Sequence, residues 1–103
     1  MDERERKYLE MIAQFPESPL GYFTLGKYYL ELGRAAEAVA PLEKSLKEEP
    51  GWTAAMVALA DALAAVGEKA GALALLQRAR GTAQAAHGGM AGDIEERLED
   101  LQD

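Results

Sequence analysis

The chain repeats its pattern of large and small residues with a period of 34 residues. Residues 19–52 can be laid over residues 53–86, so that large residues meet large ones, small meet small, and glycine meets glycine. A period of this length is the signature of stacked units, none of which can bury its apolar face alone. The matching pairs are Tyr22 and Met56, Leu25 and Leu59, Gly26 and Ala60, Tyr29 and Leu63, Gly33 and Gly67, Ala38 and Ala72, Leu42 and Leu76, and Ser45 and Ala79.

Apolar residues recur at spacings of three and four, which predicts helices throughout. Ser18 and Pro19 are suited to begin a helix, and Gly33 and Gly67 to end one in a left-handed conformation. Gly26 lies on an inner face and lets a neighbouring helix come close. The expected helices cover residues 3–15, Pro19 to about Gly33, about 35–48, 54–66, 69 to the low eighties, and 91–102.

Each helix is expected to bury one stripe of side chains. In the first two helices these inner stripes are Tyr8, Met11, Ile12 and Phe15, and then Tyr22, Leu25, Tyr29 and Leu32. Thr53 is the expected N-cap of the fourth helix, with Trp52 packing in the turn before it.

These elements predict an all-α fold of antiparallel helix-turn-helix units, because short loops force consecutive helices to be antiparallel. Residues 1–103 form a single domain in this interpretation. Its parts are an N-terminal half-repeat helix (1–17), a first repeat (19–52), a second repeat (53–86) and a C-terminal capping helix (87–103).

Composition excludes several classes of function. The absence of Cys removes disulfides and thiolate sites, and a net charge of −7 disfavours nucleic acid as a partner. The charged first residues do not form a signal peptide, and no run is long enough to span a membrane, so the expected location is the cytoplasm without a membrane partner.

No catalytic, cofactor or metal site is expected. His87 is the single histidine and lies between small residues in an expected loop, without companions at ligand spacing. The C-terminal acids lack the spacing of a calcium loop and are expected to form a solvated helix face. Glycine-rich phosphate loops and nucleophile motifs are also missing, so the chain is not predicted to be an enzyme.

The signature residues resemble the tetratricopeptide repeat. The first unit carries Pro19, Tyr22, Leu25, Gly26, Tyr29, Gly33, Ala38, Leu42, Ser45 and Pro50, and the second departs from the pattern at Gln84. The resemblance implies a right-handed superhelix with a concave groove that takes a peptide or a helix of a partner protein. The groove positions it implies are Leu20, Phe23, Thr24, Lys27, Leu30 and Glu31 in the first unit, and Ala54, Val57, Ala58, Asp61 and Ala65 in the second.

Some members of the family grip a terminal carboxylate with basic and amide side chains. The corresponding positions here are Phe23, Lys27, Ala58, Gly88 and Gly92, of which only Lys27 is suitable. The sequence therefore predicts an apolar groove rather than a carboxylate clamp.

Two pairs of alternatives stay open at this point. Leu20, Phe23 and Val57 fall outside the inner stripes, so they either form an adhesive groove or are covered by the capping helix. Lys27 and Asp61 occupy equivalent positions, and they either contact a partner's charges or pair across adjacent helices.

The predicted function is a scaffold that binds a peptide or helix of a partner protein in this groove. The alternative is a homodimer formed through the incomplete terminal repeats, because the first helix lacks the helix that would complete its own unit. In that alternative a second copy covers apolar residues such as Leu9.

Overall fold

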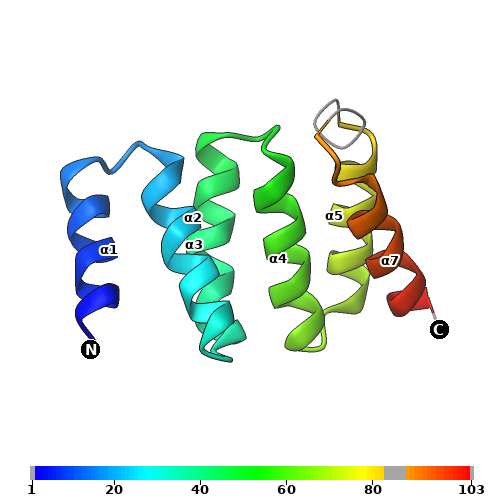
Figure 1. The fold of residues 1–103 in the computed structure, drawn as a ribbon, viewed down its shortest axis with the longest axis horizontal. Helices are drawn as coiled ribbons and strands as arrows, with labels where there is room; N and C mark the ends of the chain where they lie inside the picture. Colours follow the sequence, from blue (N-terminus) through cyan, green and yellow to red (C-terminus); the bar gives the residue numbers. More distant parts are fainter. Residues whose placement is uncertain (1, 83–87, 103) are drawn as a thin grey trace.

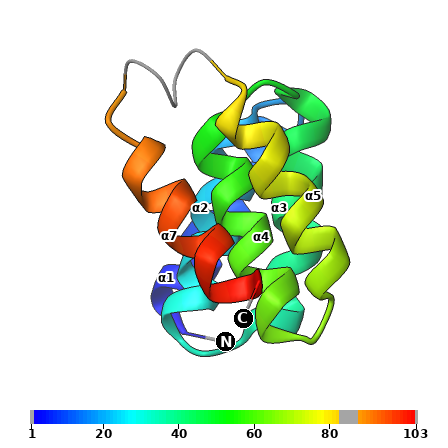
Figure 2. The ribbon, with the colours of Figure 1, turned by 90° about the vertical axis from the view of Figure 1, so that its right-hand side faces the viewer.

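The computed structural model describes residues 2–82 and 88–102, and every element in them is a helix. The helices form an elongated stack in which α1 and α7 lie at opposite ends (Figure 1). In the view of Figure 2, α2, α4 and α7 form one layer, with α3 and α5 in the other. The helices are α1 (Glu3–Gln14), α2 (Pro19–Glu31), α3 (Ala35–Glu48), α4 (Thr53–Ala65), α5 (Lys69–Arg80) and α7 (Ala91–Gln102).

The turns inside the two units have the same hydrogen-bonded geometry. Gly33 has a φ of 75° and Gly67 a φ of 88°, a left-handed conformation that glycine adopts without steric cost. The amide of each glycine donates to the carbonyl three residues earlier, Leu30 or Ala64. The following amide reaches back five residues at 2.8 Å in both turns. This repeated helix end confirms the equivalence of Gly33 and Gly67 and makes both helix pairs antiparallel.

Gly26 allows α2 and α3 to approach closely. A Cβ atom built at Gly26 would lie 2.5 Å from Cγ of Leu42, which is closer than packed carbon atoms can come. Leu42 is fully buried, so any shift of its side chain would have to displace other core atoms. In the second unit Ala60 and Leu76 occupy the equivalent positions, and both are buried as well.

The main core runs from α3 through α4 and α5 to α7. Ala38 and Leu42 of the first unit are buried in it together with their equivalents Ala72 and Leu76. The remaining members are Leu46, Ala55, Met56, Val57, Ala58, Leu59, Ala60, Ala62, Ala79, Ile94 and Leu98.

Two residues assigned to inner stripes by the sequence are exposed. Phe15 is 64% exposed and Leu32 is 46% exposed. Both follow the last residue of their helix as C-cap, Phe15 after α1 and Leu32 after α2, so the helical spacing no longer fixes where their side chains point. Thr53 also differs from expectation: it is the first residue of α4 and Trp52 is the N-cap.

Polar contacts fix α1 to the first unit. Asp2 is the N-cap of α1, and its carboxylate accepts hydrogen bonds from the Glu5 amide at 2.7 Å and the Tyr28 hydroxyl at 2.6 Å. The bond from Tyr28 lowers the pKa of the Asp2 carboxyl. The buried Glu5 carboxylate lies 3.3 Å from the guanidinium of Arg34 in the α2–α3 turn. These contacts determine where the N-terminal helix lies.

Gly26→Val should lower the free energy of unfolding by about 1–3 kcal/mol, because the added carbons overlap with the fixed Leu42 side chain. Gly71→Val is the matched control, since a Cβ atom there lies 3.4 Å from Cδ1 of Leu63, an ordinary contact. Urea unfolding measured by circular dichroism should show a change within about 0.5 kcal/mol for the control. Equal stability of the two variants would contradict the close packing of α2 and α3.

Candidate partner-binding groove

On α2 the predicted groove residues include an exposed apolar group beside an aromatic pair. Leu20 is 54% exposed. One turn later the half-buried Phe23 ring packs on Trp52, with the ring centroids 4.3 Å apart and the planes inclined by 34°. The Thr24 hydroxyl donates to the Leu20 carbonyl at 2.8 Å, so Thr24 is bound within its own helix. The α2 part of the groove therefore offers aliphatic and aromatic surface.

The charged residues of α2 at the predicted groove are accessible. Lys27 and Glu31 are exposed, and Leu30 between them is half-buried against the core. Among residues 2–82 and 88–102, no salt bridge involves Lys27. A cation without an internal partner remains available to an anionic group on another molecule.

On α4 the predicted groove residues are not on an open surface. Val57 is 6% exposed and Ala58 is 3% exposed, and both belong to the core that includes Ile94 and Leu98 of α7. This burial corrects the expectation that both side chains are open to a partner. For Val57 it agrees with the alternative that the side chain is covered, whereas Leu20 is exposed.

Asp61 is held by the C-terminal helix. Its carboxylate accepts two hydrogen bonds from Arg97 of α7, from Nε at 2.7 Å and from Nη2 at 3.1 Å. These bonds raise the pKa of the Arg97 guanidinium above its ordinary value. Asp61 therefore pairs across adjacent helices, but with Arg97 and not with Lys27.

The remaining predicted positions contribute little to a site. Ala54 is half-buried and Ala65 is exposed, and neither carries a polar side chain. Gly88 and Gly92, which correspond to clamp positions, are exposed and offer no side chain. His87 lies outside the described residues. Within the described ranges no group of three acidic, histidine or cysteine side chains is arranged to hold a metal ion.

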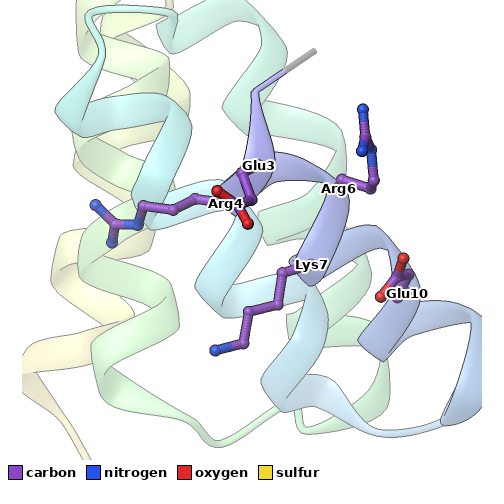
Figure 3. A pocket seen from close by; sticks show the side chains of 5 residues that line it. All are labelled: Glu3, Arg4, Arg6, Lys7 and Glu10. Carbon is purple, nitrogen blue, oxygen red and sulfur yellow. The ribbon is translucent and has the colours of Figure 1, made fainter.

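Two further hollows lie at α1. One is lined by Glu3, Arg4, Arg6, Lys7 and Glu10, all from α1, and their side chains fan outward instead of converging (Figure 3). The other lies between helices and is lined almost entirely by apolar groups. Its lining residues are Leu9 and Ile12 of α1, Tyr22 and Leu25 of α2, and Ala40, Pro41 and Lys44 of α3.

Sequence reasoning missed Tyr28 and Arg97, which position the two end helices. Tyr28 packs edge-on against Tyr8, with centroids 5.6 Å apart, and lies under the Arg4 guanidinium. Tyr28 lies three residues after Leu25, a spacing that places both side chains on the same face of a helix. The adjacent Tyr29 has the equally helical spacing of four, so the sequence does not decide which of the two tyrosines is buried. Arg97 is the single base of α7, and it follows Ile94 of the apolar stripe by three residues.

A family model described as tetratricopeptide repeat matches residues 29–91, and the chain belongs to this family. The comparison with curated proteins gave no significant match. In the parts of the chain that the structure describes, the helices are too short or too polar to cross a membrane.

Solved structures of similar fold confirm the all-α stack of helical repeats. The TPR2B domain of yeast Sti1, solved as a complex with pHsp70, has a TM-score of 0.87 at 29% identity over 95% of this chain and 79% of that one. The TPR2AB domain of yeast Sti1, in complex with pHSP90, has a TM-score of 0.87 at 30% identity over 96% of this chain. MamA has a TM-score of 0.82 at 25% identity over 94% of this chain. The chain spans 39% of the TPR2AB structure and 54% of the MamA structure.

Val57→Asp should lower the free energy of unfolding by about 3 kcal/mol or more, because it places an unpaired charge in the core. Leu20→Asp puts the same charge on an exposed position and should change stability by no more than about 0.5 kcal/mol. Thermal unfolding of both variants checks the contrast. Full stability of Val57→Asp would show that this part of α4 is open in solution.

Proposed function

We propose that this protein is a protein-interaction module that binds a segment of a partner protein along α2. The observation that carries the proposal is the group formed by exposed Leu20, the Phe23–Trp52 pair and Lys27. An apolar patch with a polar rim is the usual form of an interaction site, and aromatic residues supply much of the binding energy in such sites.

The similar structures support this role. The complexes of Sti1 domains with pHsp70 and pHSP90 are assemblies between a tetratricopeptide domain and a protein-derived ligand. The α2 surface of this chain lacks the set of side chains of a carboxylate clamp, because Ala58 is buried and Gly88 and Gly92 present no polar side chain. We expect recognition through apolar contacts and Lys27, without a requirement for the partner's terminal carboxylate.

Leu20→Asp and Lys27→Glu should each weaken the binding of a partner isolated by co-purification by about 5–10-fold, equivalent to roughly 1 kcal/mol. Isothermal titration calorimetry with the purified partner measures the change. Leu32→Asp is the control, because Leu32 is also exposed but lies at the opposite end of α2. Unchanged affinity of the Leu20→Asp and Lys27→Glu variants, or an equal loss in the control, would exclude this groove.

A homodimer through the incomplete N-terminal repeat is the second candidate. The apolar hollow beside Leu9 and Ile12 favours it, because it leaves apolar side chains of α1, α2 and α3 accessible to a second copy. The charged face of α1 alternates acids and bases, from Glu3 to Glu10, so two copies of this helix need not repel each other.

Static light scattering at micromolar concentration tests this dimer. We expect twice the monomer mass for the natural chain and monomer mass for Leu9→Asp, which places a charge in the hollow. A natural chain that is strictly monomeric would exclude the homodimer. It would not bear on the proposal that a partner binds along α2.

A further inference from the structure

A small hollow remains where α7 packs against α4 and α5. Its volume is about 170 Å³, and its surface is mainly apolar. The apolar part of the lining is formed by Ala60 and Ala64 of α4, Leu76 of α5 and Leu101 of α7. A hollow of this kind suits an aliphatic chain, because hydrocarbon that enters it leaves water.

Three charged side chains complete the lining of this hollow, namely Asp61, Arg97 and Asp100. All three nitrogen atoms of the Arg97 guanidinium donate within the chain, Nε and Nη2 to the Asp61 carboxylate at 2.7 and 3.1 Å and Nη1 to the Asp93 carbonyl at 3.1 Å. Asp100 is exposed, and in the described parts of the chain its carboxylate forms no ion pair. Two carboxylates face one guanidinium, so one negative charge of the lining has no counterpart.

The bases of α5 do not neutralise this charge. Arg78 donates to the Pro50 carbonyl at 2.6 Å, and Arg80 lies 2.7 Å from Glu95. Lys69, the first residue of α5, does not line the hollow. The unmatched carboxylate is therefore accessible to a cation from another molecule.

We propose that this hollow binds a lysine side chain of a partner protein, with the aliphatic stem in the hollow and the ammonium group at Asp100. Lysine joins a four-carbon stem, which is buried readily on apolar surface, to a compact cation. The apolar lining selects the stem and the unmatched carboxylate selects the charge, so a neutral or acidic side chain satisfies only part of the site.

The inference rests on the function proposed above for one point, that the lysine belongs to a protein. The helices α4 and α7 share a layer with α2, so one partner can contact both the hollow and the α2 surface (Figure 2).

N-acetyl-lysine methylamide is the probe, because it carries the lysine side chain and no other charge. When it is titrated into the isotope-labelled full-length protein, the amide signals of Ala60, Ala64 and Leu101 should shift saturably, with a Kd in the millimolar range expected for so small a ligand. N-acetyl-norleucine methylamide has the same stem without the charge and should bind about three- to five-fold more weakly. Absence of saturable shifts, or equal binding of the two probes, overturns the proposal.

Asp100→Asn removes the unmatched charge and should weaken binding of the lysine probe by about three- to five-fold, without a change for the norleucine probe. Glu99→Gln is the matched control, because Glu99 is an exposed acid of α7 that does not line the hollow. An equal effect of the two variants would show that the overall charge of α7, and not the hollow, attracts the probe.

Ala64→Leu tests the apolar part of the site, because the larger side chain fills the hollow. It should abolish the shifts caused by both probes, whereas Ala65→Leu, at an exposed position outside the lining, should preserve them. Unchanged binding by a folded Ala64→Leu variant would exclude the hollow as the site.

Leu20→Asp separates this inference from the proposed function, since Leu20 does not line the hollow and its replacement should leave lysine binding unchanged. If the probe does not bind while Leu20→Asp still weakens the purified partner, only the lysine site is overturned. If the probe binds but Asp100→Asn leaves the partner's affinity unchanged, the hollow takes free amines, and the proposal of a partner's lysine is overturned.

Discussion

The structure depends on the contact between Leu42 and the backbone of α2 at Gly26. Because Gly26 has no side chain, the Leu42 side chain fills the space between the two helices and becomes fully buried. In the second unit Ala60 and Leu76 occupy the equivalent positions, and both are buried as well. The stack is then built from two similar hairpins, each with an apolar face that its neighbour covers.

The two ends of the stack are completed by different interactions. At the N-terminal end, α1 is held by hydrogen bonds and ion pairs that involve Asp2, Glu5, Tyr28 and Arg34. At the C-terminal end, α7 is held by buried aliphatic anchors and by ion pairs at their edge. The proposed binding surface on α2 thus lies nearer to the end that is fixed by the Asp2–Tyr28 and Glu5–Arg34 contacts.

Most of the fold was predictable because periodicity acts over whole helices. The glycines that end α2 and α4, the close approach at Gly26 and the inner residues of α3 and α5 follow from local pattern alone. Phe15 and Leu32 were assigned wrongly because they are cap residues, where the helical spacing no longer applies.

The candidate site was less predictable than the fold. On α2, Leu20, Lys27 and Glu31 are exposed, whereas Phe23 and Leu30 are half-buried, and the binding role of all five stays a prediction. On α4, the burial of Val57 and Ala58 depends on neighbouring helices, so the sequence of α4 does not reveal it. The pairing of Asp61 with Arg97 joins residues far apart in the chain, and α7 does not follow the 34-residue period that would have placed it.

The packing of Trp52 against Phe23 gives the molecule a natural optical reporter. The chain contains one tryptophan, and its indole ring is in contact with a residue of the α2 groove. Any molecule that displaces solvent from the Phe23 ring changes the surroundings of this single fluorophore. Its emission therefore offers a dye-free measurement of the binding proposed along α2.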